Sequence, residues 1–263
     1  MTDITFLGET PYKRLKALMT RLRKDCPWDS QQSFETIAPY TIEEAYEVSD
    51  AIERADMKGL REELGDLLFQ VLFHAEIASE NNEGFNLDDV SDALVRKMVD
   101  RHPHVFTELE KDGAKIETPS WEALKAAERK AKGYDSLLDD VPNALPALMR
   151  AEKLQKRAAR VGFDWPDIEG VFAKISEETN EVSDAIESGE QDAIEDEIGD
   201  LIFAVTNLAR KTGIDPEKAL RRTNVKFSKR FKFIEAEAKA QGRAVSHMDL
   251  DEMEALWQAA KNA

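Results

Sequence analysis

The sequence lacks several features that define common classes of protein. Its single cysteine, Cys26, cannot form an internal disulfide, which excludes a disulfide-stabilised scaffold. No apolar run approaches the roughly 18 residues that a membrane span requires. The opening residues MTDITFLGET also lack the basic-then-apolar pattern of a secretion signal. These absences predict a cytoplasmic protein that does not act at a membrane.

Basic residues are scarce relative to acidic ones. The chain has 36 Lys and Arg against 53 Asp and Glu, which gives a formal net charge of −17. Most of this surface would repel a nucleic-acid polymer or an anionic membrane, so we expect neither as a partner. A small anion is still compatible with the chain where a metal ion or local basic residues reverse the sign.

Strand-like alternation is hard to find in the sequence, and glycine and proline are sparse. Ala, Leu, Glu, Lys and Arg instead recur at helical spacing, which favours an all-α protein. The 263 residues exceed a typical single domain, and two domains are the natural expectation.

An internal repeat organises the chain. Residues 41–71 align without gaps to residues 175–205, and both contain EVSDAIE followed by an E-x-G-D-L-x-F segment. Between the copies, two prolines, a glycine and an acidic cluster in 133–148 are typical of a linker or a short connecting turn. We therefore predict two tandem copies of one helical-bundle domain, residues 1–133 and 134–263. Downstream of each aligned segment lie matching basic residues: Lys97 and Arg101 in the first copy, Lys226 and Arg230 in the second.

Four carboxylates of the second copy lie at or beside apolar helix faces. Glu178 falls in a stripe that the helical pattern otherwise fills with apolar residues, and Glu181 projects from the same face. Glu197 and Asp200 lie along the margin of the apolar stripe of the next helix, and a short turn would make the two helices antiparallel neighbours. Four carboxylates then converge across one interface.

Such a cluster predicts a metal ion, because uncompensated buried charges each cost several kcal/mol. Oxygen ligands without histidine or thiolate suit Mg²⁺, with Mn²⁺ as a substitute. The alternative, that these acids form solvated helix faces, is weakened by their recurrence in the first copy. The matching residues there are Glu44, Glu47, Glu63 and Asp66.

The motif E-E-x-x-E, a spacer and E-x-x-D resembles the signature of the MazG-like all-α nucleoside triphosphate pyrophosphatases. The resemblance covers essentially the whole chain. It implies Mg²⁺-dependent hydrolysis of nucleoside triphosphates to the monophosphate and pyrophosphate, broad base specificity, a housecleaning or stress-related role and a homodimer. It also implies that the C-terminal copy is the active one, although the first copy keeps all four acids.

Carried over by position, the resemblance implies three sets of site residues. The metal ligands are Glu178, Glu181, Glu197 and Asp200. The catalytic residues are Glu177, Glu178, Lys226 and Arg230, with Glu177 or Glu178 as the acceptor of a water proton. The substrate-binding residues are Lys174, Glu177, Asp200, Lys226, Arg230, Trp257 and Lys261.

Alternatives remain for the basic and aromatic residues and for the function. Lys226 and Arg230 share a helix face and suit phosphates, but a basic amphipathic run is also typical of a solvated face. Trp257 suits stacking on any base, or simple packing near the chain end. The function has two competing hypotheses. One is a non-catalytic regulatory helical dimer stabilised by metal, and the other is an enzyme restricted to modified or deoxy nucleotides.

Overall fold

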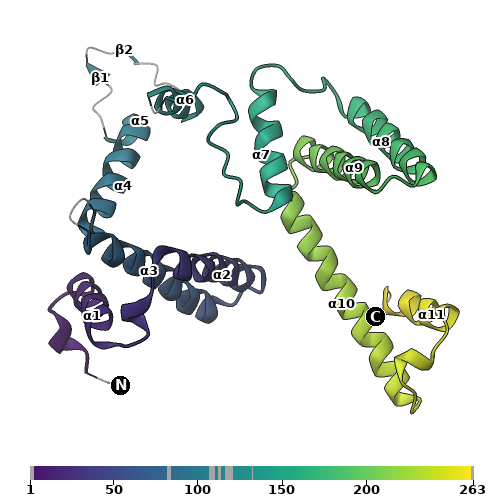
Figure 1. The fold of residues 1–263 in the computed structure, drawn as a ribbon, viewed down its shortest axis with the longest axis horizontal. Helices are drawn as coiled ribbons and strands as arrows, with labels where there is room; N and C mark the ends of the chain where they lie inside the picture. The colour runs from purple at the N-terminus through teal and green to yellow at the C-terminus, as the bar shows by residue number, and fades with distance from the viewer. Residues whose placement is uncertain are drawn as a thin grey trace. The chain divides into compact units, whose positions relative to one another are not determined.

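The protein is described here by a computed structural model, which covers residues 3–81, 84–106, 110–111, 114–115, 121–131 and 133–261 (Figure 1). The all-α prediction is confirmed: the described β structure is one two-residue antiparallel pair, β1 (Glu110–Lys111) with β2 (Ala114–Lys115). The helices are α1 (Pro11–Asp25), α2 (Phe34–Glu53), α3 (Met57–Ser79), α4 (Leu87–Arg101), α5 (Pro103–Phe106), α6 (Trp121–Ala131), α7 (Ala147–Ala159), α8 (Ile168–Ser188), α9 (Gln191–Lys211), α10 (Pro216–Ala240) and α11 (Leu250–Lys261). The 3-10 turns are η1 (Thr5–Leu7), η2 (Asp29–Gln31) and η3 (Val245–His247).

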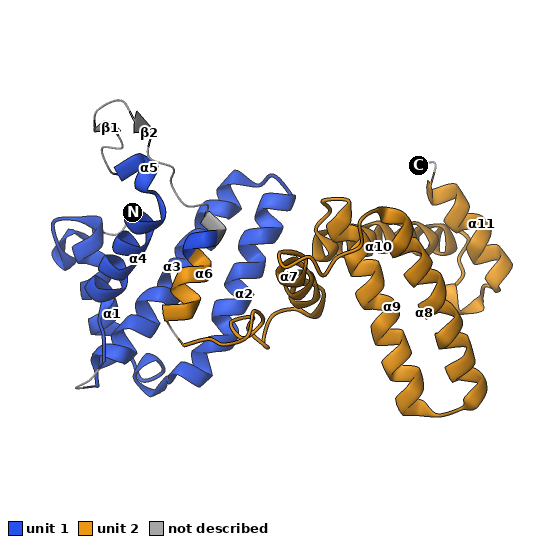
Figure 2. Cartoon of the chain, turned by 90° about the horizontal axis from the view of Figure 1, so that it is seen from above, with its two compact units in different colours: residues 1–124 blue, residues 125–263 orange. Residues whose placement is uncertain are grey.

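The chain divides into two compact units, residues 1–124 and 125–263 (Figure 2). Each unit contains one of the repeated helix pairs, α2 with α3 in the first and α8 with α9 in the second. The boundary between these two units falls inside α6, earlier in the chain than the predicted domain boundary between residues 133 and 134. That boundary, as a limit between folding domains, stays a prediction.

The first unit is built around the antiparallel pair α2 and α3. Ser33 begins α2 with a capping box, in which the Ser33 and Thr36 side chains each accept a hydrogen bond from the other's backbone N–H. The core joins α1, α2 and α3 through apolar side chains, which are almost completely removed from water and supply most of the stabilisation. These core residues are Met19, Ile37, Leu72, Phe73 and Ile77.

The second unit is built around the antiparallel pair α8 and α9, with α7 and α10 packed against α9. Asp167 caps α8 by accepting a hydrogen bond from the Gly170 N–H at 3.1 Å. Gly189 ends the helix in the left-handed region, at φ 73°, a conformation that favours glycine. A separate apolar cluster of Ile234, Ala238 and Met248 attaches α11 to the distal part of α10.

The segment predicted to be a linker is fastened to the second unit. The Arg157 guanidinium on α7 donates to the Leu137 carbonyl at 2.8 Å and pairs with the Asp140 carboxylate. Val141 is buried nearby in the sequence. These contacts give the segment a defined path rather than that of a free tether.

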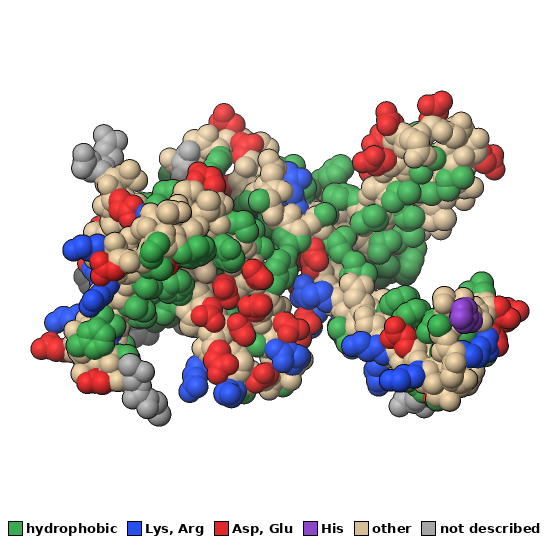
Figure 3. Space-filling model, turned by 60° about the horizontal axis from the view of Figure 1, so that its bottom comes forward, with side chains coloured by type: hydrophobic (Ala, Val, Ile, Leu, Met, Phe, Trp, Pro, Cys, Tyr) green, Lys and Arg blue, Asp and Glu red, His purple; other side chains and the backbone are tan. Residues whose placement is uncertain are grey.

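The apolar stripe expected on α9 is largely exposed. Ile198, Ile202 and Val205 each leave more than two fifths of their surface open, whereas the buried α9 residues are the small Ala204 and Thr206. Hydrophobic side chains reach the surface of both units (Figure 3). Exposed apolar residues at this density are typical of surfaces that another molecule covers.

Within the described ranges, no helix combines the length and apolarity that crossing a membrane demands.

Candidate metal and nucleotide site

The α8 helix turns one carboxylate into the protein interior. Val171, Glu178 and Ala185 are its buried residues and recur every seven positions, so they line a single face. Glu178 is only 3% exposed. The prediction that Glu178 occupies a core position is therefore confirmed by its burial.

The α9 helix adds two carboxylates to this position. One carboxylate oxygen from each of Glu178, Glu197 and Asp200 lies within 4.8 Å of the others. Glu181 stands beside them, and burial together with a hydrogen bond to Glu178 raises the pKa of its carboxyl. The structure thus brings together the four acids that the sequence singled out.

Lys174 places a positive charge at the edge of this cluster. Its Nζ lies 2.6 Å from Oε1 of Glu178 and 2.9 Å from Oε1 of Glu177. The hydrogen bonds to Glu178 and then Glu177 raise the pKa of Lys174, so its ammonium stays charged. This is the only lysine or arginine in an ion pair with the four clustered acids among the described residues.

The other oxygen of Glu178 indicates which kind of ligand the cluster suits. Oε2 is buried and has no hydrogen-bond partner in the described part of the chain. Leaving a buried carboxylate oxygen unsatisfied is strongly unfavourable. The clustered atoms that could coordinate a metal ion are all carboxylate oxygens, which hard divalent cations prefer as ligands. These residues therefore fit a divalent ion.

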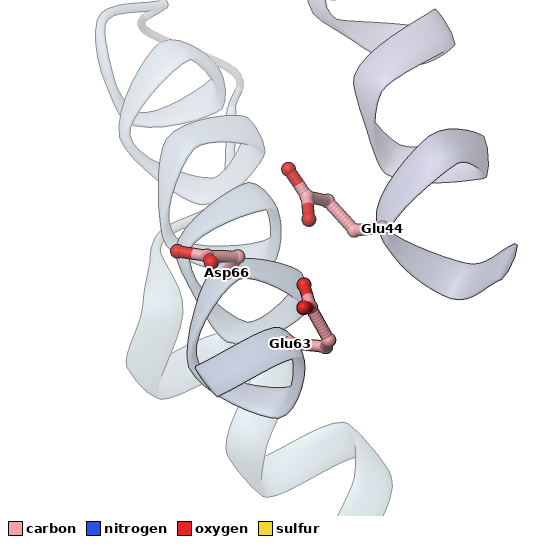
Figure 4. A group of neighbouring side chains, drawn as sticks. All are labelled: Glu44, Glu63 and Asp66. Atoms are coloured by element: carbon pink, nitrogen blue, oxygen red, sulfur yellow. The ribbon is translucent and has the colours of Figure 1, made fainter. Parts of the chain in front are cut away.

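The first copy repeats the arrangement between α2 and α3. Glu44 reaches from α2 toward Glu63 and Asp66 on α3, with one oxygen of each within 4.8 Å of the others (Figure 4). Burial, followed by the charges of Asp66 and Glu47, raises the pKa of Glu44. Burial and then Glu47 likewise raise the pKa of Glu63. Both shifts indicate negative charge without sufficient compensation.

The predicted phosphate and base contacts form a second group, on α10 and α11. The Arg230 guanidinium lies over the Trp257 ring, 5.3 Å from its centroid, and the Phe227 ring packs against the same indole. Lys226 is exposed, and Lys261 donates to Gln258.

This basic and aromatic group lies apart from the acids within one chain. In the described residues, no hydrogen bond or ion pair joins it to the four carboxylates, and α11 with the distal part of α10 stands away from the α8–α9 pair (Figure 1). The packing interpretation of Trp257 gains support from its contact with Phe227. The predicted roles in nucleotide binding stay predictions.

Sequence reasoning missed a polar column beside the first cluster. Thr41 Oγ1 lies 3.0 Å from Nε2 of His74. The His74 ring stacks on Phe34, and burial lowers the pKa of His74. Gln70, between Asp66 and His74 on α3, is buried. A position-by-position comparison of the two copies could have found these residues. Thr41, Gln70 and His74 are polar, whereas the residues aligned with them in the second copy are apolar: Ile175, Ala204 and Leu208.

The fold and the site define a class: an all-α protein with two helix pairs, each suited to hold a divalent cation between paired carboxylates. The model of the MazG nucleotide pyrophosphohydrolase domain matches residues 32–106 and 167–234, which contain both pairs. The chain belongs to this family of hydrolases, as the resemblance predicted.

Relatives match nearly the whole chain. It is 47% identical over 253 residues to a nucleoside triphosphate pyrophosphohydrolase of Escherichia coli, a match that covers 94% of this chain and 96% of that protein. It is 39% identical over 252 residues to the nucleoside triphosphate pyrophosphohydrolase/pyrophosphatase MazG of Thermotoga maritima, with 95% of each covered. It is also 43% identical over 253 residues to the uncharacterized protein YabN of Bacillus subtilis, a match that covers 95% of this chain and 51% of that protein.

Proposed function

We propose that the protein hydrolyses nucleoside triphosphates to the monophosphate and pyrophosphate at the C-terminal copy, with Mg²⁺ as the activating ion. The observation that carries the proposal is the buried, unpartnered oxygen of Glu178 beside Glu197 and Asp200. Membership of the family and the names of the relatives supply the reaction. We place this activity in the cytoplasm, as a housecleaning or stress-related function.

The carboxylates have separate roles in this proposal. Glu178, Glu181, Glu197 and Asp200 would hold the metal. A metal ion held there would offset the negative charge of the triphosphate and lower the pKa of a water molecule. Glu177 is exposed and is not one of the three clustered acids Glu178, Glu197 and Asp200, so we assign it the acceptance of the water's proton.

The substrate contacts come from the basic and aromatic group. Lys226 and Arg230 would hold phosphate oxygens, with Lys174 and Lys261 as further positive charges. Trp257 would stack on the base, and stacking tolerates every base because each presents a π face. This gives broad base specificity.

We further propose that a homodimer assembles the complete site. Within one chain the acids and the basic group lie apart, while Ile198, Ile202 and Val205 on α9 are exposed. A second copy that covers this stripe would bury it and bring its own α10 and α11 toward the acids. The single chain then carries both halves of a site that it does not close by itself.

Product analysis tests the reaction. Wild type with ATP and Mg²⁺ is expected to form AMP and pyrophosphate, and Glu178→Gln to lose at least about a hundredfold in rate because one metal ligand is neutralised. Glu195→Gln removes an exposed charge of the same helix pair and serves as the matched control. Release of orthophosphate without AMP would exclude the proposed reaction. Loss of activity in Glu44→Gln, but not in Glu178→Gln, would move it to the first copy.

Substrate range and the non-catalytic alternative are separated by two further measurements. Similar rates with dUTP, dCTP, ATP and oxidised dGTP would support broad specificity, while a single preferred deoxynucleotide would contradict it. An absence of turnover with any nucleotide under Mg²⁺ or Mn²⁺, combined with a metal-dependent rise in melting temperature, would favour a metal-stabilised regulatory dimer.

A further inference from the structure

We infer that Lys174 couples metal binding to nucleotide binding at the C-terminal site, because its ammonium competes with a metal ion for Glu178 and is drawn away when a triphosphate binds. The metal ion and the triphosphate then bind more tightly together than either binds alone. The inference rests on the proposed function. It gives Lys174 a positioning role in addition to the phosphate contact proposed above.

Lys174 holds two carboxylates of α8 at once. Its Nζ lies 2.6 Å from Oε1 of Glu178 and 2.9 Å from Oε1 of Glu177. The two acids follow the lysine by four and three positions, so all three side chains project from the same helix face. One ammonium therefore contacts both a proposed metal ligand and the proposed acceptor of the water's proton.

The burial of Glu178 makes this contact matter for metal affinity. Glu178 is almost completely buried, while about one third of the Lys174 side chain is exposed. Solvent screens such a pair less than a fully exposed one, so the ammonium offsets part of the charge that attracts a metal ion. A divalent cation at the unpartnered Oε2 would also be repelled by this nearby positive charge.

A triphosphate relieves this competition. Its phosphate oxygens carry negative charge and attract an ammonium, which binds phosphate as a point charge. Because the Lys174 side chain reaches water, its flexible stem can turn toward a bound phosphate without crossing the protein interior. Glu178 is then free for the metal ion, and Glu177 is free to accept a proton. By linkage, the metal ion strengthens triphosphate binding by the same factor.

The first copy has no equivalent of this ammonium. The residue aligned with Lys174 is Tyr40, which is uncharged at neutral pH. Among the described residues, no lysine or arginine is recorded in an ion pair with Glu44, Glu63 or Asp66. The coupling is therefore expected at the C-terminal copy alone.

The experiment compares two affinities of the full chain. Electron paramagnetic resonance measures the binding of free Mn²⁺, and calorimetry measures the binding of the preformed Mn²⁺ complex of α,β-methylene ATP, which is not cleaved between those phosphates. All chains carry Glu44→Gln with Asp66→Asn, so that the acids of the first copy do not contribute.

Lys174→Met is expected to change the two affinities in opposite directions. Free Mn²⁺ should bind about tenfold more tightly because the competing charge is gone, and the nucleotide complex about tenfold more weakly because a phosphate contact is lost. A loss of structure alone would weaken both. Lys174→Gln is a second neutral variant, and circular dichroism checks that the helices persist.

Two controls accompany these variants. Lys174→Arg keeps the charge and should stay close to wild type in both affinities. Lys58→Met removes a lysine that pairs with Glu62 in the first unit, and should change neither.

Two results would overturn the inference while leaving the proposed function intact. One is a pair of neutral variants that bind free Mn²⁺ no more tightly than wild type. The other is a change of both affinities in the same direction. A wild-type chain that binds neither free Mn²⁺ nor the nucleotide complex would contradict the proposed function and the inference together.

Discussion

Lys174 and Glu178 form a half-neutralised pair: the ammonium lies 2.6 Å from one carboxylate oxygen, while the other oxygen, Oε2, is buried without a partner. The lysine side chain is about one third exposed, so the pair lies where the protein interior meets water. Glu178 thus has one side stabilised by the chain itself and one side left for a ligand.

Removing this lysine is expected to make the C-terminal unit depend on metal. In Lys174→Met the buried Glu178 loses its ion pair, and the free energy of unfolding should fall in EDTA, by less than the loss of a fully buried pair would cost. Excess Mg²⁺ should stabilise this variant more than wild type. Thermal melts with and without Mg²⁺ measure both effects.

The control for Lys174→Met is Lys58→Met, which removes an exposed ion pair with Glu62. Its unfolding free energy is expected to change by less than about 0.5 kcal/mol, with or without metal. An equal loss in the two variants would show that Lys174 does not stabilise Glu178.

The hairpin residues Gly189 and Ala55 occupy aligned positions, and both lie in the left-handed region, at φ 73° and 54°. An added Cβ at Gly189 would meet open space, so Gly189→Ala changes only the backbone preference. It should lower the free energy of unfolding by about 1 kcal/mol.

The reverse change, Ala55→Gly, is expected to raise the free energy of unfolding, but by less than about 1 kcal/mol. Relief of the left-handed strain is partly offset by the greater freedom of glycine in the unfolded chain. Urea titrations measure the free energy of unfolding of both variants. An unchanged free energy of unfolding in Gly189→Ala would contradict this explanation.

The contact between Asp140 and Arg157 predicts that the free energy of unfolding depends on pH. The hydrogen bond from Arg157 holds the pKa of Asp140 below its ordinary 3.8. A carboxyl with a lowered folded pKa contributes stability above about pH 4 and loses it as the pH falls through the folded pKa. Asp140→Asn should therefore be less stable than wild type at neutral pH, by about 1 kcal/mol, and the difference should shrink below about pH 4.

Urea titrations of wild type and Asp140→Asn between about pH 7 and about pH 3 measure this dependence. A difference that stays constant over the whole range would show that the charge of Asp140 is not what fastens the segment to α7.

Ile202 tests the proposed dimer. It is 49% exposed on α9, and a charge there would be buried if a second copy covers the stripe. Ile202→Glu is expected to halve the mass measured by light scattering after size exclusion and to reduce nucleotide hydrolysis. Helicity should be retained, because the side chain is half in water within the chain. A wild-type monomer, or a variant that remains dimeric, would contradict the proposal.

The helix pairs and their acids follow from the sequence for a physical reason. Apolar positions repeat at helical spacing. Glu178 is a carboxylate at one of these positions, and a charged residue is unusual there because the position is buried. The gap-free alignment of the two copies then indicates that each copy contains the same pair of helices with the same acids. This reasoning placed the clustered carboxylates correctly, since spacing along one helix determines which side chains share a face.

Other features lie beyond this kind of reasoning. Periodicity predicts an apolar face on α9, but a face covered by the same chain and one left exposed have the same pattern, so the exposure of Ile202 could not be predicted. The separation of Arg230 from the acids depends on the direction in which α10 leaves α9. That direction is set by tertiary packing rather than by local spacing. The buried Gln70 needed a comparison of the two copies.

The short hairpins that join α2 to α3 and α8 to α9 also bear on how the chain acquires its structure. Each pair brings together segments that are close in sequence, and such local contacts form quickly because little loop entropy is lost. During synthesis the first pair is complete while much of the second copy is still unmade. The repeated architecture therefore lets the two halves fold in succession, each from its own hairpin.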